Sequence, residues 1–147
     1  MTWCLTVPDS GQTPTLVELK RFPDSNGMLV VAVDGASGFK ARRVFTVHSD
    51  RGAVRGEHAH IECSQFLVAL SGAVKIPIVG RGFSDEFTLD RPSVGLLLPP
   101  MTWASQISLV DGCVLMVICD LDYDEGDYVR DLDEFMSLIS RRRHSAQ

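Results

Sequence analysis

The chain has 147 residues and a formal net charge of −5, with 14 Lys and Arg against 19 Asp and Glu. This length fits one domain around one core, and the 45% of apolar residues can fill that core. The negative balance argues against a non-specific nucleic-acid binder, because phosphate contacts need clustered Lys and Arg. The one basic cluster, Arg141–Arg143, lies in residues 141–147, where we expect a solvated, flexible tail.

Short β-rich runs follow one another along most of the chain. Val, Ile, Leu, Phe and Thr are common in them, and breakers such as Asp34-Gly35, Asp50–Gly52, Gly80–Gly82 and Asp111-Gly112 mark turns. The expected strands are Leu16–Leu19, Leu29–Val33, Arg42–His48, Ser64–Leu70, Ala73–Val79, Glu86–Leu89, Gly95–Leu98, Ser105–Leu109 and Cys113–Cys119. Many short strands with this punctuation predict an all-β double-sheet sandwich or jelly roll.

One helix is predicted, at the end of the chain. Asp131 or Asp133 can cap its N-terminus. Its expected apolar face consists of Leu132, Phe135, Met136 and Ile139. Tyr123 and Tyr128, with their acidic neighbours, are expected to fix this C-terminal segment.

The cysteines and the N-terminus predict a reducing compartment. Cys4, Cys63, Cys113 and Cys119 show no CxxC spacing, and the last three lie in or beside apolar runs, which favours buried free thiols over disulfides or a zinc site. The N-terminus lacks a basic region followed by a long apolar run, so no secretory signal is predicted. No stretch approaches the ~18 apolar residues of a membrane span. We therefore expect a cytoplasmic protein.

The strongest chemical signal is the pair His58 and His60. Residues two apart in a strand share a face, so both imidazoles would project together, with Ala59 on the other side. Such a pair can ligate a metal through neutral imidazole. It can also move protons near neutral pH. Taken alone, a structural or exposed pair is equally consistent with this spacing.

The spacing around the pair resembles the first cupin motif, which runs Gly, His-x-His, an acidic ligand and Gly. Gly52, His58, His60 and Gly72 occupy these positions. Gln65 stands where the acidic ligand would be, and the Pro-rich turn at Pro99–Ser105 lacks the His of the second motif. An amide is a poor substitute for a carboxylate on a transition metal. We therefore expect a cupin without metal, in which the pair transfers protons.

Further stretches resemble one family, the dTDP-4-keto-6-deoxyglucose 3,4-ketoisomerases, or WxcM-like cupins. Two runs are specific, RGEHAH at Arg55–His60 and YDEGDYVRDLDEF at Tyr123–Phe135. The other matches are Arg43–Phe45, Gln65 with Ala69–Gly72, Leu89–Pro92, Gly95–Leu96, Leu98–Pro100 and Trp103.

This resemblance covers about residues 14–140, the core of one cupin domain spanning residues 1–147. It implies a jelly-roll homodimer that exchanges strands between subunits. It also implies an enzyme without metal or cofactor, acting on a dTDP-linked keto sugar in deoxysugar or lipopolysaccharide biosynthesis.

The implied reaction suits two histidines. Moving a ketone from C4 to C3 of the sugar needs a proton to leave C3 and a proton to arrive at C4, through an enediol. A base with a pKa near neutrality suits the first step, and a second group must polarise the carbonyl or deliver a proton. By resemblance, His58 is the leading base, and His60 orients the sugar or relays protons.

The resemblance also implies substrate-binding roles for Arg43, Thr46, Arg55, Gln65 and Trp103. Gln65 would hydrogen-bond a sugar oxygen or fix an imidazole tautomer. Arg55 would meet the diphosphate, because guanidinium matches phosphate geometry, although a solvated turn arginine is the alternative. Trp103 would stack on the base or sugar, or else anchor the core.

Three positions depart from the family pattern. Thr46 stands where the family usually has a Tyr that helps proton transfer, and a threonine hydroxyl is a far weaker acid. His48 has the same strand parity and is either a substitute or a surface residue at a strand end. Asn26 and Ala104 stand where Arg, Tyr or His are usual, so the wall of the site is less basic and less bulky.

Three functions follow from these observations. The first is a 3,4-ketoisomerase, or an isomerase or epimerase on a related nucleotide-keto sugar. The second is a non-catalytic sugar-nucleotide-binding cupin, which Thr46, Asn26 and Ala104 favour. The third is a metal-dependent cupin such as a dioxygenase, which the missing third His disfavours.

Overall fold

The computed structural model describes residues 13–34 and 39–145, with side chains as far as Arg141. Cys4 and Gly35 therefore lie outside the described residues. The strands are β1 (Thr15–Glu18), β2 (Lys20–Asp24), β3 (Gly27–Val31), β4 (Arg43–Ser49), β5 (Val54–His60), β6 (Gln65–Ser71), β7 (Val74–Gly80), β8 (Phe83–Leu89), β9 (Val94–Leu98), β10 (Trp103–Ser108), β11 (Cys113–Cys119) and β12 (Tyr128–Val129). A 3-10 turn, η1 (Glu125–Asp127), precedes β12, and the helix α1 (Leu132–Ser145) ends the described chain.

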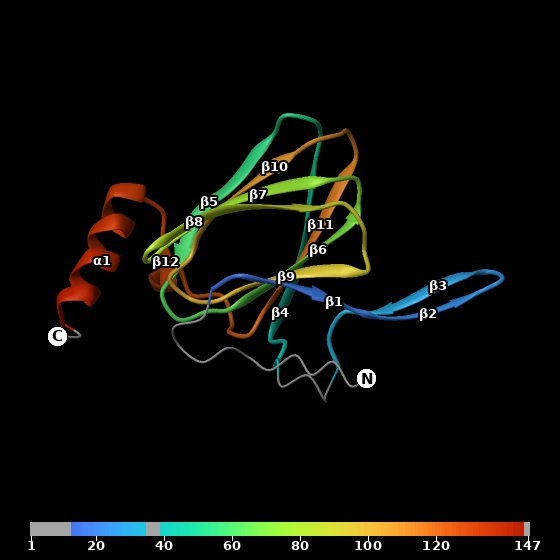
Figure 1. Ribbon diagram of the computed structural model, residues 1–147, viewed down its shortest axis with the longest axis horizontal. Helices are drawn as coiled ribbons and strands as arrows, with labels where there is room; N and C mark the ends of the chain where they lie inside the picture. The colour runs from blue at the N-terminus through green and yellow to red at the C-terminus, as the bar shows by residue number, and fades with distance from the viewer. Residues whose placement is uncertain (1–12, 35–38, 146–147) are drawn as a thin grey trace.

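Two antiparallel sheets of five strands face each other as a sandwich (Figure 1). Their orders are β1-β9-β6-β11-β4 and β12-β5-β10-β7-β8, and a hairpin of β2 and β3 extends away from them. The predicted all-β jelly roll with a C-terminal helix is confirmed.

The core lies between the sheets and depends on alternation along the strands. In β7, Val74, Ile76 and Ile78 point inward, while the residues between them are half-buried. β6 is apolar on both faces. Its Phe66 and Val68 side chains belong to a second hydrophobic cluster, which covers the outer side of the sheet. These two layers bury the apolar runs that the sequence predicted as strands.

Every expected strand overlaps an observed one, but β2, β5 and β12 are missing from the expected set. β2 reads KRFPD, is exposed throughout and contains a Pro, so it carries no strand pattern. β12 has two residues and is too short to show a period. The sequence implied β5 only through the expected common face of its two histidines. A bulge interrupts the alternation of inward and outward side chains along this strand, so no regular strand pattern is visible.

The buried thiols agree with the sequence. Cys63, Cys113 and Cys119 are buried and free. Within the described ranges, no helix combines the length and the apolar character that crossing a membrane requires.

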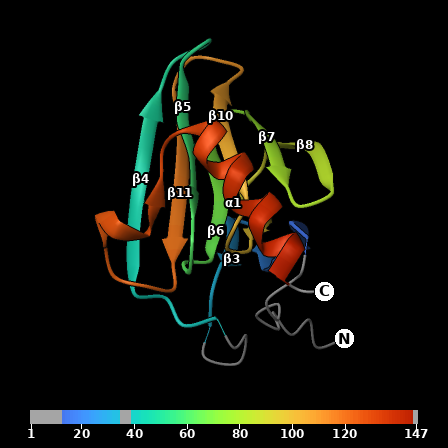
Figure 2. The same ribbon diagram turned by 90° about the vertical axis from the view of Figure 1, so that its left-hand side faces the viewer.

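The helix α1 lies against one end of the sandwich (Figure 2). Asp131, rather than Asp133, caps it, because its carboxylate accepts the Glu134 N–H at 2.8 Å. Phe135 and Ile139 lie on the buried face of the helix, as predicted, in a cluster that includes Trp103. The expectation that Leu132 and Met136 belong to the buried face is wrong: only a narrow stripe of the helix meets the sandwich, and both are exposed.

Replacing Phe135 with Ala should lower the free energy of unfolding by about 3–5 kcal/mol, because the ring is fully buried and its removal leaves a cavity. Met136→Ala, on the exposed side of the same turn, should change it by no more than about 0.5 kcal/mol. Denaturant unfolding measures both. Equal losses would show that α1 is not docked as described.

Candidate active site

A bulge in β5 sets the direction of the His pair. Gly56 and Glu57 both have positive φ, 78° and 58°, and Glu57 is an extra residue opposite β10. A Cβ on Gly56 would lie 3.1 Å from the Ala104 carbonyl oxygen, so glycine fits both the backbone angle and the space. After the bulge, His58 and His60 project from the same face of β5.

The two imidazoles border a small open hollow. Its other walls come from the strands and loops around them, and include Cys63, Gln65, Thr102, Ala104 and Gln106. The rings of His58 and His60 meet edge to face with their centroids 5.0 Å apart. The structure therefore brings together the two residues that the sequence proposed as catalytic, with the Ala104 wall beside them.

Tyr128 adds a phenol to the pair. β12 runs beside β5 with Tyr128 opposite His60, and its ring centroid lies 4.3 Å from His60 and 5.0 Å from His58. Arg43 Nη1 donates a hydrogen bond to the Tyr128 hydroxyl at 3.1 Å. The sequence predicted only a scaffold role for Tyr128, because nothing in the chain order indicates that β12 pairs with β5.

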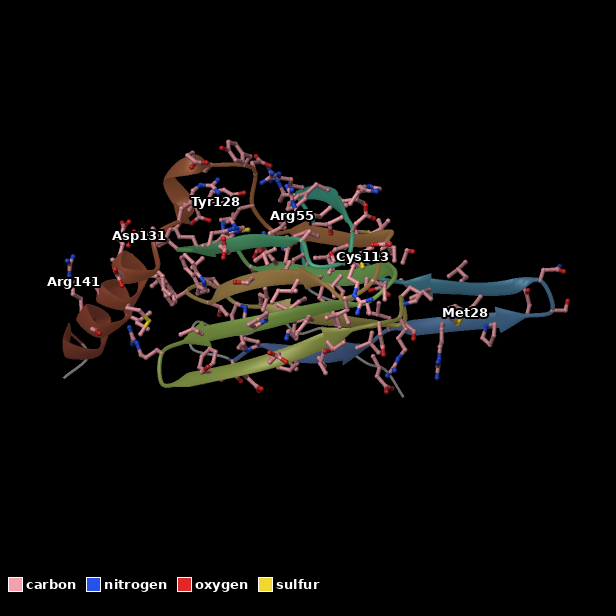
Figure 3. The ribbon with its side chains drawn as sticks, turned by 90° about the horizontal axis from the view of Figure 1, so that it is seen from above. Met28, Arg55, Cys113, Tyr128, Asp131 and Arg141 are labelled. Atoms are coloured by element: carbon pink, nitrogen blue, oxygen red, sulfur yellow. The ribbon has the colours of Figure 1, made fainter. Side chains whose placement is uncertain are left out.

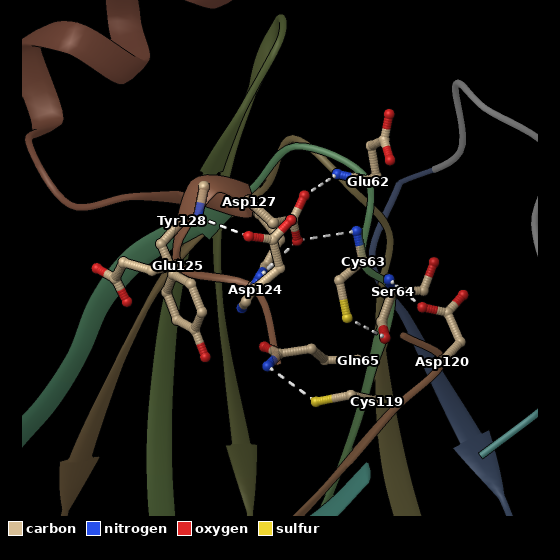
Figure 4. A network of polar contacts seen from close by, with 12 residues as sticks. Glu62, Cys63, Ser64, Gln65, Cys119, Asp120, Asp124, Glu125, Asp127 and Tyr128 are labelled. Atoms are coloured by element: carbon tan, nitrogen blue, oxygen red, sulfur yellow. Dashed lines mark hydrogen bonds and ion pairs between the residues drawn. The ribbon is translucent and has the colours of Figure 1, made fainter. Parts of the chain in front are cut away.

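Asp127 holds the second histidine by its Nδ1. The carboxylate Oδ2 lies 3.0 Å from His60 Nδ1, while the two oxygens also accept the backbone N–H groups of Glu62 at 2.7 Å and Cys63 at 3.3 Å (Figure 4). An acceptor at Nδ1 makes it the protonated nitrogen of the neutral ring. Nε2 is then left with its lone pair, and among the described residues it has no hydrogen-bond partner.

Burial lowers the pKa of both histidines below the usual 6.5. For His60, Asp127 opposes this effect, and for His58 the backbone of Gly56 does so. Both rings are therefore neutral near neutral pH, the form in which imidazole accepts a proton. His58 Nδ1, like His60 Nε2, is buried without a partner among the described residues.

Two of the expected substrate-binding residues lie close to the pair. Gln65 is buried in the wall of the hollow, with its Nε2 3.5 Å from Cys119 Sγ. Arg43 lines an adjoining hollow that also includes His60, and its guanidinium lies 4.9 Å from the Tyr123 ring centroid.

Thr46 lies on the other face of its strand. Arg43 and Phe45 are half-buried, whereas Thr46 and His48 are exposed, and Thr46 Oγ1 lies 2.9 Å from His48 Nε2. His48 is thus a surface residue at the strand end, one of the two readings that the sequence left open. Neither Thr46 nor His48 lines the hollow beside His58.

Arg55 and Trp103 also lie apart from the hollow. Arg55 precedes the bulge and its side chain is exposed (Figure 3). Trp103 is buried with its ring centroid 5.9 Å from that of Phe135, as the core-anchor alternative expects. Its neighbour Ala104 faces the hollow instead, because successive residues of a strand alternate.

Glu125 and Arg130 form a charged pair beside Tyr128, which the sequence alone did not indicate. Glu125 accepts hydrogen bonds from Arg130 at 2.8 and 3.0 Å and from the Tyr123 hydroxyl at 2.6 Å. These contacts, Arg130 first, lower the pKa of Glu125 to about 2. The Arg130 guanidinium lies 4.3 Å from the Tyr128 ring centroid, so a cation stands next to the phenol.

His60, Cys63 and Asp127 offer ligand atoms within 4.8 Å of one another, a spacing that could hold a metal ion. The Asp127 oxygens already accept two backbone N–H groups and contact His60. The Cys63 thiol donates to the Ser64 carbonyl at 3.3 Å. A metal ion would have to replace these contacts, so the donor set fits a hydrogen-bond network better than a metal centre.

Neutral buried histidines beside a phenol, in the hollow of a jelly roll, define a cupin-type protein equipped for proton transfer. The chain belongs to the FdtA family, whose model, described as WxcM-like, C-terminal, matches residues 12–140.

Solved and curated relatives agree with this assignment. The TDP-4-oxo-6-deoxy-alpha-D-glucose-3,4-oxoisomerase of Aneurinibacillus thermoaerophilus is 34% identical over 128 residues, covering 86% of this chain and 92% of the relative. The sugar 3,4-ketoisomerase QdtA of Thermoanaerobacterium thermosaccharolyticum, crystallised with TDP, matches with a TM-score of 0.82 and 31% identity. That match covers 88% of this chain and 96% of the other. The relatives are isomerases.

Asp127→Asn should disturb the tautomer of His60. An amide NH₂ turned toward Nδ1 would favour protonation of Nε2 instead, and the loss of the carboxylate removes an effect that raises the His60 pKa. We expect long-range ¹H–¹⁵N spectra to show the Nδ1–H form in the parent protein and a mixture in the variant, with titration of His60 moved to lower pH. Asp85→Asn, at an exposed site on β8, is the control. An unchanged tautomer and titration would contradict the role given to Asp127.

Proposed function

We propose that this protein is a sugar-nucleotide 3,4-ketoisomerase acting on a dTDP-4-keto-6-deoxyhexose. The observation that carries the proposal is the pair of buried, unpartnered nitrogens, His58 Nδ1 and His60 Nε2, in a chain of this family. A variant of QdtA, 30% identical to this chain, has been crystallised with TDP-4-keto-6-deoxyglucose. The same chemistry would serve an isomerase or epimerase on a related nucleotide-keto sugar.

In the proposed reaction, His58 removes the proton from C3 of the sugar. The electrons of the C3–H bond form the C3–C4 double bond, and the C4 oxygen receives a proton to give the enediol. A proton then leaves the C3 oxygen, and C4 is protonated as the C3 ketone forms. The close contact of the two rings allows His60 to serve the neighbouring carbon or oxygen.

Tyr128 supplies the phenol that Thr46 cannot. Its hydroxyl oxygen accepts from Arg43, so its own O–H is available to donate to the sugar oxygen. Such a donor stabilises the charge that develops on the oxygen as the enediol forms. With Tyr128 as the donor, the His pair has an acid partner even though Thr46 replaces the Tyr that is usual in the family.

We assign the binding of the substrate to the residues around the pair. Gln65 lies where it can hydrogen-bond a sugar oxygen. Arg130 is a candidate for the diphosphate, together with Arg55 as predicted from the sequence, since both guanidinium groups are exposed. Thr46 and Trp103 remain predictions from the resemblance, with no contact in one subunit to support them. The proposed reaction uses no metal and no cofactor.

The hairpin of β2 and β3 supports the proposed homodimer. It extends beyond the sandwich, with Met28 at the end of the molecule opposite Arg141 (Figure 3). Phe22 and Leu29 are cross-strand partners and are 58% and 59% exposed. An isolated two-stranded ribbon is barely stable in water, so a second copy of the chain is the expected cover. Asn26 at the hairpin turn would then approach the partner subunit.

We place the enzyme in the cytoplasm, in a deoxysugar pathway such as that of lipopolysaccharide. Free thiols at Cys63, Cys113 and Cys119 suit a reducing compartment.

Incubation with TDP-4-keto-6-deoxyglucose in deuterated water tests the reaction. We expect a product with its ketone at C3 and deuterium on the ring. His58→Asn should lower the rate by about 10²–10⁴-fold, because it removes the base. His48→Asn, on the exposed face of β4, should leave it unchanged. Tight TDP binding without exchange at high enzyme concentration would instead support the non-catalytic sugar-nucleotide-binding cupin, which Ala104 also favours.

The pH profile should have its acid limb below 6.5, the ordinary histidine pKa. Burial lowers the pKa of both histidines, so the rate should stay constant as pH falls toward that value and drop only when the bases become protonated. Measurement of kcat/KM against pH tests this. An acid limb above 6.5 would show that neither histidine, in this environment, is the base.

Phe22→Asp combined with Leu29→Asp should convert the dimer to a monomer, because two buried charges would lie in the proposed interface. Sedimentation equilibrium measures the mass. Leu132→Asp, an acidic substitution at an exposed site in the first turn of α1, should leave the dimer intact. A parent protein that is monomeric at assay concentrations would overturn the proposal.

A further inference from the structure

Two thiols beside the His pair have no part in the proposed reaction. Cys63 and Cys119 are 5% and 1% exposed, and both line the hollow that contains Arg43 and Tyr128. Cys63 lies just before β6, and Cys119 ends β11, the strand paired with it, in register with Gln65. Figure 4 shows both sulfur atoms on the same side of these strands as the Gln65 side chain.

The hydrogen bonds around the two sulfurs are unequal. Cys63 Sγ donates to the Ser64 carbonyl at 3.3 Å, and so keeps its proton. Cys119 Sγ accepts from Gln65 Nε2 at 3.5 Å. The neighbouring Cys63 thiol lowers the pKa of Cys119 to about 7, and the Gln65 amide and the charge of Arg43 add to this effect. The same contact and burial raise the pKa of Cys63. Cys119 is therefore the reactive thiolate near neutral pH.

Cys113 provides the contrast. It is also buried, but its thiol donates to the carbonyls of Ala73 and Val110, at 3.3 and 3.2 Å. It lies at the far end of β11 from Cys119 and lines neither hollow described above. Burial alone therefore does not distinguish Cys119; the neighbouring thiol and amide do.

We propose that Cys63 and Cys119 form an oxidation site for hydrogen peroxide, and that their disulfide switches off the adjacent active site. The Cys119 thiolate attacks one peroxide oxygen, the O–O bond breaks, and the departing hydroxide takes a proton to become water. Cys63 sulfur then attacks the resulting sulfenic acid, the S–O bond breaks, and hydroxide leaves with the Cys63 proton as a second water. The two sulfurs lose two electrons, and one peroxide is reduced to two waters.

The disulfide would change the position of His60 through Asp127. Cys63 and Cys119 are diagonal neighbours on adjacent strands, typically about 7–8 Å apart between Cα atoms, which exceeds the usual separation in a disulfide. The segment at Cys63, which lies outside the β6 ladder, must therefore shift toward β11. The Cys63 N–H donates to Asp127 Oδ2, which in turn contacts His60 Nδ1, so the shift disturbs the orientation of the His60 ring. Cys119 also ceases to accept from Gln65.

The test treats the full chain, in a Cys4→Ser background and with a chelator present, with hydrogen peroxide near neutral pH. Non-reducing peptide mapping should show a Cys63–Cys119 crosslink that a thiol reductant removes. Cys63→Ser should stop at a Cys119 sulfenic acid that dimedone traps. Cys113→Ser should behave like the parent. Oxidation at Cys113 first, or two thiols that stay reduced, would overturn the proposal.

The effect on turnover rests on the proposed function, whereas the crosslink does not. We expect the oxidised protein to lose about tenfold or more of its isomerase rate and to recover it on reduction. The His60 ¹H–¹⁵N resonances should move on oxidation even where no turnover is measured. A reduced enzyme without turnover would count against the proposed function alone. A complete crosslink that changes neither the rate nor the His60 resonances would overturn the switch.

Discussion

The carboxylate of Asp127 joins the C-terminal segment to the end of β5, and the site depends on this junction. One side chain accepts from the backbone at Glu62 and Cys63 and contacts His60 Nδ1. It thereby determines the tautomer of His60 and the path of the chain leading into β6. The adjoining residue, Tyr128, is brought to the His pair by the same junction.

Burial makes this junction chemically useful. A histidine taken out of water is more easily kept neutral, and both members of the pair have lowered pKa values for that reason. A second consequence is that one nitrogen of each ring is buried and has no hydrogen-bond partner among the described residues. The aromatic and charged groups of Tyr128, Arg43 and Arg130 supply the polarity that the apolar core cannot.

Strand parity explains which of the expected residues share the site. On β4, Arg43 faces the interior and Thr46 faces away. On β10, Ala104 faces the hollow and Trp103 faces α1. Thr46 therefore lies away from the pair, and the phenol beside the pair comes from Tyr128 on β12.

The sequence by itself determined the jelly roll and the His pair, because these are expressed in local periodicity and in the spacing of neighbouring residues. It could not determine that Asp127 and Tyr128 belong to the site, since they are 67 and 68 residues beyond His60 and meet it only when β12 pairs with β5. That Cys63 and Cys119 line the same hollow was hidden for the same reason. Such contacts depend on the register between distant strands, which only the packing of the whole sandwich decides.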